Sequence, residues 1–204
     1  MSVTTTPDAA RVTDGVLLPR AGVWEIDPGH TDVAFTGRHL MFTKVRGHFT
    51  DVRGTVIVGE EMNDSQVDVV IAMASVHSGN DIRDDHLRST ELFDVVRFPQ
   101  ATFSSVGVDW AGDRGRVLGD LTIHGVTRRV PLEVVFEGQV RDPWGSDRAI
   151  FSATTQLNRE DFGITWNVAL EAGGVLVSKD IALAIEIETA GLFDDSWKKT
   201  ARAK

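Results

Sequence analysis

The sequence predicts an all-β fold, an eight-stranded antiparallel barrel with a short helical insertion. Val, Ile, Thr and Phe recur in short stretches, apolar and polar side chains alternate along them, and the chain contains 19 glycines. This is the composition of strands joined by turns. Short turns pair successive strands antiparallel, and eight strands can close into a barrel that has no exposed edge. A two-sheet sandwich remains the alternative, because periodicity alone does not separate the two.

The 204 residues suit one domain. We expect it to span residues 22–190, between a flexible N-terminal arm, residues 1–21, and a solvated C-terminal tail, residues 191–204. The first strand, residues 23–26, stops at the turn sequence Asp27-Pro28-Gly29. A second strand covers residues 31–36.

The next segment is less regular. Residues 37–46 are ambiguous, and part of this segment can form one helical turn. A long strand is expected over residues 47–59, with a bend or bulge at Gly54. Residues 66–75 alternate clearly and place Val67, Val69, Ile71 and Met73 on one face.

A helix is predicted over residues 81–93. Asn80 is a suitable N-cap, and the acidic side chains that follow it suit the positive helix start. Pro99 ends any helix before it. Strands resume after Pro99, and we expect them at residues 102–110, 116–123, 127–140, 148–158 and 179–189. A loop of about twenty residues, a length that is often functional in a compact domain, covers residues 159–177.

The net charge of −9 disfavours nucleic acid and anionic membrane surfaces as partners. No stretch approaches the ~20 apolar residues of a membrane-spanning helix, so no integral membrane segment is expected. The first twenty residues contain no apolar run typical of a secretory signal, so we expect a cytoplasmic location.

Motifs of catalysis are not evident. The chain has no cysteine and no G-x-S-x-G sequence, and its glycines form no phosphate-binding fingerprint. The six histidines are not paired at the spacing of metal ligands on one helix or strand. We therefore expect no enzyme activity, no metal and no cofactor.

Two segments are candidates for binding a ligand. In the predicted helix, Arg83 and His86 lie beside apolar residues and can bind the polar head group of a ligand. The alternative is a surface helix whose arginine side chains pair with nearby aspartates. In the long loop, Phe162 and Trp166 can line an entrance, whereas Arg159 can bind a ligand or only brace the loop.

Six separate elements, in order, resemble the YceI-like, polyisoprenoid-binding family across residues 22–190. They are Trp24-x-Ile26-Asp27-x-x-His30-Thr31-x-Val33-x-Phe35, with His39 following it; Gly47-x-Phe49; Arg83-Asp84-x-His86-Leu87; Phe93-Asp94 with Phe98-Pro99; Gly119-x-Leu121-Thr122-Ile123-His124-Gly125-Val126-Thr127; and Arg159-x-Asp161-Phe162-Gly163.

This resemblance implies a lipocalin-like barrel that binds a polyisoprenoid or similar amphiphilic lipid, such as a polyprenyl pyrophosphate, an isoprenoid quinone or a fatty amide. It also implies a possible homodimer. Family members are often periplasmic, whereas the first residues here favour an intracellular carrier or storage role. The alternatives are an enzyme acting on a lipid or small stress metabolite, and an interaction module with a filled core. The expected ligand-binding residues are His39, Phe42, Arg83, His86, Leu87, Phe93, Arg159, Phe162 and Trp166.

Overall fold

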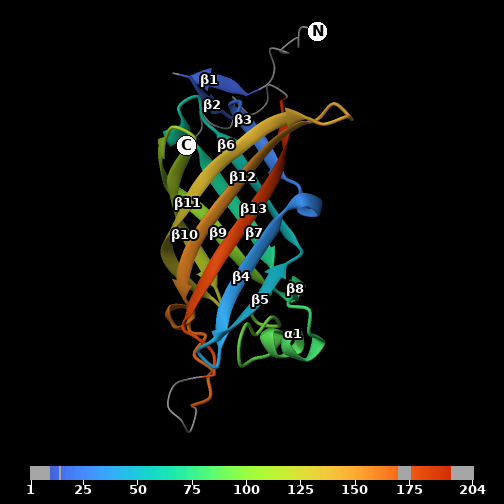
Figure 1. Ribbon diagram of the computed structural model, residues 1–204, viewed down its shortest axis with the longest axis vertical. Helices are drawn as coiled ribbons and strands as arrows, with labels where there is room; N and C mark the ends of the chain where they lie inside the picture. Colours follow the sequence, from blue (N-terminus) through green and yellow to red (C-terminus); the bar gives the residue numbers. More distant parts are fainter. Residues whose placement is uncertain (1–9, 14, 170–175, 194–204) are drawn as a thin grey trace.

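The computed structural model describes residues 10–13, 15–169 and 176–193, and eight of its strands form a closed antiparallel ring. In order around the ring they are β12 (Asp147–Asn158), β11 (Val126–Arg141), β10 (Arg114–Ile123), β9 (Gln100–Ala111), β7 (Gln66–Ala72), β6 (Val52–Val58), β3 (Gly22–Ile26) and β13 (Asp180–Leu192). Pairing of β13 with β12 closes the ring. The predicted barrel is confirmed, and the sandwich is excluded (Figure 1).

One edge of β13 is shared between two strands. Residues 189–192 pair with β3, and residues 182–186 pair with β4 (Asp32–His39). The short helix η1 (Pro28–His30) separates β3 from β4. Beyond β4 the sheet continues through β5 (Thr43–Phe49) to β8 (Val76–His77). The sheet therefore extends past the ring at the lower end in Figure 1.

Two predictions for residues 37–59 differ from the structure. The ambiguous segment forms the β4–β5 hairpin, not a helical turn, and the predicted strand 47–59 is divided into β5 and β6. The division is at Thr50 and Asp51, whose backbone N–H groups donate to the Ser75 hydroxyl at 3.2 and 3.1 Å. A side chain from η3 (Met73–Ser75) thus fixes a turn that contains neither glycine nor proline.

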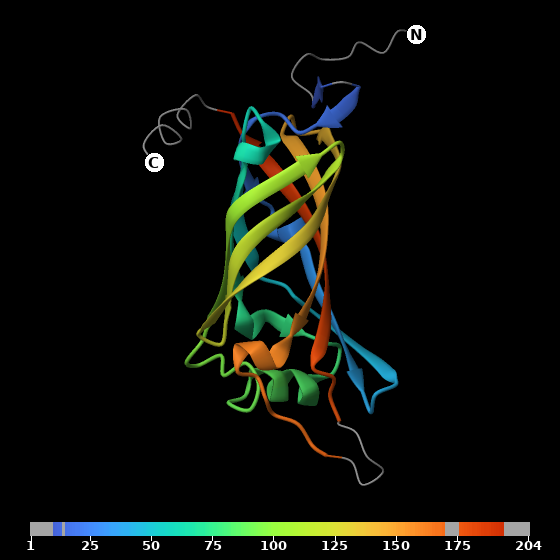
Figure 2. The same ribbon diagram turned by 90° about the vertical axis from the view of Figure 1, so that its left-hand side faces the viewer.

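The helix α1 (Asp81–Arg88) ends earlier than predicted. The Asn80 side chain caps it by accepting from the backbone N–H of Arg83 at 3.0 Å. Ser89 stops it, since its extended backbone directs its N–H to the carbonyl of His86 at 3.1 Å. At the start of the predicted long loop, the chain forms η4 (Arg159–Phe162), and both short helices lie at the lower end of the barrel (Figure 2).

The described part of the predicted N-terminal arm packs on the upper end of the barrel (Figure 1). There β1 (Arg11–Thr13) and β2 (Val16–Leu18) form a hairpin. The Arg11 guanidinium donates to the carbonyl of Gly59 at 2.8 Å, beside η2 (Met62–Asp64). The Arg20 guanidinium lies 4.0 Å from the centre of the Phe193 ring. Flexibility of the arm stays a prediction, and most of the predicted C-terminal tail, residues 194–204, lies outside the described residues.

Apolar side chains gather in three clusters inside the sheet. One surrounds Trp24 and Phe136, a second surrounds Val52 and Met73, and the third surrounds Phe103. The alternation predicted for β7, β11 and β13 is confirmed, because the apolar side of each strand faces these clusters. In the part of the chain that the structure describes, no helix has the length and apolar character needed to cross a bilayer.

Candidate functional site

A cavity lies inside the barrel between the three apolar clusters, and the space not filled by atoms there, open solvent at its mouth included, is about 1080 Å³. It is lined by the inward face of the ring strands. The aliphatic lining comes mainly from β6, β7, β10, β11 and β13, and includes Val56, Val58, Val67, Val69, Ile71, Val117, Leu121, Leu132, Val134, Leu183, Ile185 and Ile187.

The lining offers very few polar groups. Ser65, Ser152 and Thr155 are its polar residues. The Ser152 hydroxyl donates to the Glu137 carboxylate at 2.5 Å, and the Ser65 hydroxyl accepts from the N–H of Gly59 at 3.1 Å. No ionisable side chain is among the described lining residues. The cavity is therefore suited to an apolar group and offers no acid or base to it.

The exposure of the lining shows that the interior is hollow. Val67, Ile185 and Ile187 point inward, yet they are only half-buried, whereas Trp24 in the upper cluster is fully buried. A side chain that faces inward and keeps accessible surface must face empty space. This finding argues against a barrel filled by its own side chains.

None of the nine predicted ligand-binding residues is among the side chains that line the cavity. Leu87 and Phe93 pack beneath the lower end, against the cluster of Val52 and Met73. Phe162 is buried in the Phe103 cluster. Their contact with a ligand stays a prediction.

The other predicted residues lie at the lower end, in the β4–β5 hairpin, in α1 and η4, and in the loop that follows η4. His39 bridges to Val177, and Phe42 is 82% exposed. The ring of His86 meets that of Trp166 edge to face, with centroids 4.4 Å apart. The His86 Nε2 atom also lies 2.8 Å from the Glu91 carboxylate.

The two predicted arginines differ in how their donors are used. Arg83 donates through Nε to the Ser78 hydroxyl at 2.7 Å and through Nη2 to the Ser78 carbonyl at 2.8 Å. Arg159 is buried and donates to the carbonyls of Ser178 at 3.0 Å and Ile164 at 2.6 Å. Its Nη2 atom has no hydrogen-bond partner among the described residues. Burial lowers the pKa of the Arg159 guanidinium, and the nearby carboxylate of Glu160 opposes this.

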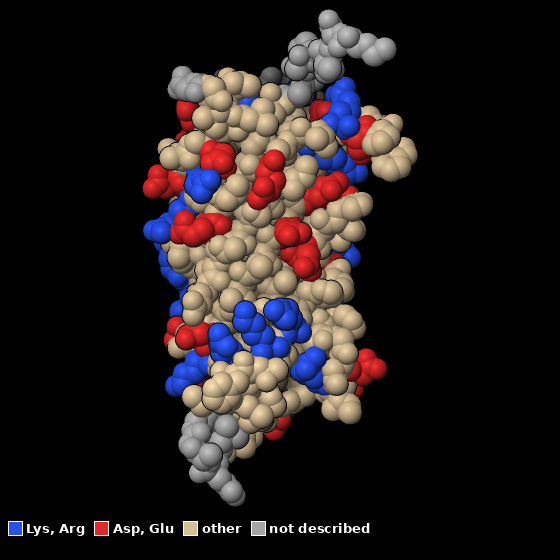
Figure 3. Space-filling model, viewed as in Figure 1, with Lys and Arg blue, Asp and Glu red and all other residues tan. Residues whose placement is uncertain are grey.

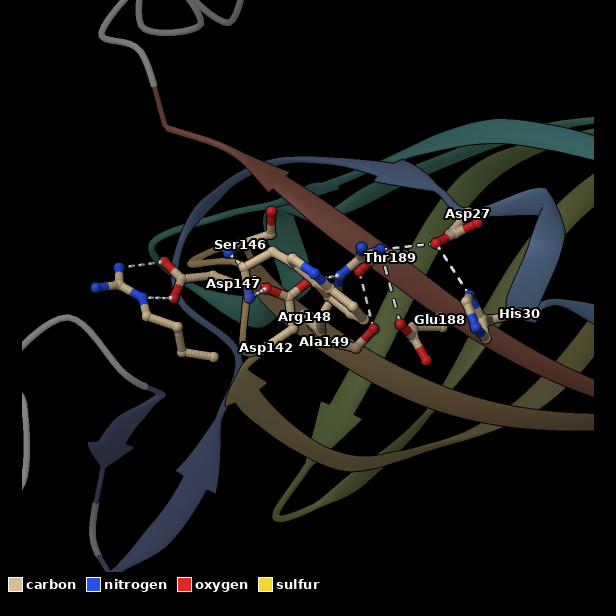
Figure 4. A network of polar contacts seen from close by, with 11 residues as sticks. Asp27, His30, Asp142, Ser146, Asp147, Arg148, Ala149, Glu188 and Thr189 are labelled. Carbon is tan, nitrogen blue, oxygen red and sulfur yellow. Dashed lines mark hydrogen bonds and ion pairs between the residues drawn. The ribbon is translucent and has the colours of Figure 1, made fainter.

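A polar network lies on the opposite, upper part of the barrel, where η1 meets β12 and β13 (Figure 4). Asp27, His30 and Glu188 are close enough to share a metal ion. However, Arg148 donates to the Asp27 carboxylate at 2.7 Å and lies 3.7 Å from that of Glu188. The guanidinium already supplies the positive charge, so we assign these residues to an ion-pair network.

This network also shifts pKa values. Burial alone would raise the pKa of Asp27, but hydrogen bonds from His30, the N–H of Gly29 and Arg148 hold it below its ordinary value. The pKa of Asp142 is lowered by a hydrogen bond from the backbone of Ser146, with Arg148 adding to the effect against burial. Both carboxylates therefore stay ionised and keep β12 joined to its neighbours.

Sequence reasoning did not place the cavity lining among the site residues. The signal was present, since the alternation in residues 66–75, 127–140 and 179–189 marks the inward side chains. The motifs instead directed attention to the lower end, where their residues make local contacts.

Comparisons with known proteins agree with this geometry. The YceI-like domain family matches residues 24–189. The chain is 38% identical to Protein YceI of Salmonella newport (strain SL254) over 160 residues, covering 78% of this chain and 81% of that protein.

Two solved structures are also similar. A YceI protein from Campylobacter jejuni is 28% identical, with a TM-score of 0.65 over 76% of this chain and 90% of that one. A polyisoprenoid binding domain from Saccharophagus degradans has a TM-score of 0.63 and 14% identity, and covers 85% of this chain and 100% of that one. The second likeness concerns the fold alone.

Proposed function

The chain belongs to the YceI-like family, and from this premise we propose that it binds a long apolar lipid, such as a polyisoprenoid, inside its barrel. The observation that carries the proposal is the hollow interior with its aliphatic lining. The ligand class named for the Saccharophagus degradans domain fits such an interior.

The shape of the barrel suits a long tail. The 13 residues of β13 correspond to a strand of about 43 Å at 3.3 Å per residue. Burial of each CH₂-sized group of a tail is worth about 0.8 kcal/mol. Transfer of a tail of several isoprene units from water into the barrel therefore contributes enough binding free energy that the ligand requires few polar contacts.

The head group requires a different environment. Among the arginines and histidine predicted to receive it, Arg83 directs Nε and Nη2 to Ser78, and His86 directs Nε2 to Glu91. Arg159 keeps one donor without a partner among the described residues and has no ion pair there. We therefore favour Arg159 as the contact of an anionic head group, such as a phosphate, at the lower end of the barrel.

The proposed role is binding, in storage or transport, and not catalysis. A cavity without ionisable side chains supplies no general acid or base to a bound molecule. A cytoplasmic location and a homodimer are further parts of the proposal.

Solvent extraction of the purified protein, followed by mass spectrometry, tests the proposal. We expect a lipid with a long apolar tail at a near-stoichiometric amount. A purified protein that yields no lipid and does not take up an added polyprenyl phosphate or polyprenol would contradict it.

A further inference from the structure

The tip of the β4–β5 hairpin exposes three consecutive apolar side chains. Leu40, Met41 and Phe42 are 42%, 52% and 82% exposed. The tip turn closes with the N–H of Phe42 donating to the carbonyl of His39 at 3.2 Å. Large apolar side chains gathered at one exposed point usually mark an interaction site.

The backbone of this tip is unusual for its residues. Leu40 and Met41, the two central residues of the turn, have φ values of 51° and 67°. Hairpin turns of this type are usually occupied by Asn-Gly or Asp-Gly, because other side chains are strained there. The hairpin thus keeps bulky apolar residues where small polar ones would be less strained, and strain of this kind is often found at functional sites.

Behind the tip, the outer face of the hairpin is cationic. The register places Arg38 directly opposite Lys44 and Arg46 opposite Thr36, and all three cations are exposed. Like charges directly opposite one another destabilise a strand pair. Among the described residues, no ion pair joins any of the three to an acidic group, whereas many other surface arginines have one.

The hairpin also stands apart from the body of the molecule. Figure 2 shows β4 and β5 splaying away from the barrel at its lower right. In Figure 3, Lys and Arg side chains gather over the lower part of the face, while acidic side chains lie mainly above them. The apolar tip and the cationic face of the hairpin therefore project from the same end of the barrel.

We propose that the β4–β5 hairpin docks the protein on an anionic lipid bilayer. Leu40, Met41 and Phe42 enter the boundary between head groups and acyl chains, and Arg38, Lys44 and Arg46 contact the head-group phosphates. This inference goes beyond the proposed function and does not depend on it, because docking needs only the outside of the hairpin.

A bilayer fits the hairpin better than a protein partner does. The apolar tip is a projection of three residues, and a fluid interface accepts a projection without a matching pocket. The net charge of −9 opposes approach of the whole molecule to an anionic surface. However, charges separated by more than about 8–10 Å are largely screened at physiological salt. The cations of the hairpin therefore determine the electrostatic interaction with the bilayer.

Co-sedimentation with vesicles tests the proposal. The full chain is expected to bind vesicles of phosphatidylcholine with phosphatidylglycerol better than phosphatidylcholine alone, and added salt should weaken the binding. Lys44→Gln should weaken it about five-fold, equivalent to ~1 kcal/mol for one surface cation. Phe42→Ser should weaken it about ten-fold or more, since it removes an aromatic ring that docking would bury in the bilayer.

Matched controls lie at the other end of the barrel. Arg114→Gln removes an exposed cation that pairs with Asp113 at 3.0 Å, and Trp144→Ser removes a ring that is 87% exposed. Neither change should alter vesicle binding. Equal losses in the controls, or no preference for anionic vesicles, would overturn the proposal.

Fluorescent labels give a second readout. Because the chain has no cysteine, Met41→Cys and Trp144→Cys each provide one site for an environment-sensitive dye. Anionic vesicles should shift the emission of the dye at position 41 to the blue and leave the dye at position 144 unchanged. If hairpin substitutions abolish self-association of the protein and spare vesicle binding, the hairpin docks on a second copy and the proposal is wrong. Lipid uptake into the barrel is measured separately, so either idea can fail alone.

Discussion

Gly119 on β10 lies directly against the ring of Phe103 on β9, and a Cβ atom at position 119 would be 2.2 Å from Phe103 Cζ. The β9–β10 register shifts between Leu118 and Gly119, at this same point. Phe103 lines the cavity. The missing side chain at Gly119 therefore sets how far the ring reaches into the interior.

Gly119→Ala should push the Phe103 ring toward the cavity. We expect the free energy of unfolding to fall by about 1–3 kcal/mol, as in other overpacked cores, and the uptake of a long-tailed lipid to decrease. Urea denaturation measures the first effect. Gly107→Ala, on β9 with no neighbouring atom within 4 Å, is the control and should change stability by less than ~0.5 kcal/mol. Equal effects of the two substitutions would contradict this role for Gly119.

Asp84 joins α1 to the end of β8 through hydrogen bonds and an ion pair. It is buried, accepts from the N–H of Ser78 at 2.9 Å and from its hydroxyl, and lies 3.2 Å from His77 Nδ1. Burial would raise the pKa of Asp84, but the hydrogen bonds from Ser78, with His77 and Arg88, hold it below its ordinary value.

Asp84→Asn should lower the free energy of unfolding at neutral pH by about 2 kcal/mol, because a charged hydrogen-bond acceptor is lost. A carboxyl with a lowered folded pKa stabilises the fold above its unfolded pKa and loses this effect as the pH falls through the folded value. The difference from wild type should therefore be full above about pH 4 and shrink below it. Asp85→Asn, at the exposed neighbour, should have little effect; a pH-independent loss at Asp84 would show that its charge is irrelevant.

Arg148 is the centre of the upper polar network. Its guanidinium contacts Asp27, Asp142 and Glu188. Arg148→Gln should lower the free energy of unfolding by about 2–3 kcal/mol, because half-buried carboxylates lose their counter-charge. The pKa values of Asp27 and Asp142 should rise, which NMR titration measures. Arg116→Gln, in a surface pair with Glu133, is the control and should change stability by less than ~1 kcal/mol. A stable variant with unchanged pKa values would refute this assignment.

Arg159 is predicted to distinguish ligands by their head group. Arg159→Gln should weaken binding of a polyprenyl phosphate about ten-fold more than binding of the matching polyprenol, since a hydrogen bond to a charged group contributes about 1.5–3 kcal/mol. The ratio of the two affinities is the measurement, because loss of the bonds to Ser178 and Ile164 affects both ligands alike. Arg83→Gln should leave the ratio unchanged. An unchanged ratio in Arg159→Gln would remove Arg159 from this role.

The strands were predictable because one side of each faces the interior. Ile181, Leu183, Ile185 and Ile187 alternate without interruption, and all belong to β13. Closure of the ring into a barrel was expected only because eight strands were predicted. The sharing of β13 between β3 and β4 depends on hydrogen bonds between distant segments, which no local pattern encodes.

Smaller differences have local causes. The turn between β5 and β6 escaped prediction, because a hydroxyl from Ser75 replaces the usual glycine or proline. The N-terminal hairpin had a usable signal, since Asp14-Gly15 is a turn sequence that precedes the apolar stretch Val16-Leu17-Leu18. α1 was predicted too long, because residues 89–93 contain no glycine or proline, and the helix ends at Ser89, whose extended backbone directs its N–H to the carbonyl of His86.

The cavity lining was not predicted from the sequence, whereas the barrel was. The family motifs pointed to Arg83, His86 and Arg159, which lie at the lower end and bind neighbouring protein groups. The cavity itself follows from inward side chains that leave space between them, and a sequence shows which residues face inward but not how far apart opposite strands stand. The cytoplasmic location and the homodimer stay predictions.

Two neighbouring residues on β12 test the central claim, that a lipid tail occupies the barrel. Ala153 lines the cavity and Thr154 is exposed on the outer face. The measurement is the dissociation constant of a fluorescent polyprenyl phosphate for Ala153→Trp and Thr154→Trp, with circular dichroism to confirm that both fold. We predict that Ala153→Trp loses binding and Thr154→Trp keeps wild-type affinity. Wild-type affinity in a folded Ala153→Trp protein would show that the lipid binds elsewhere.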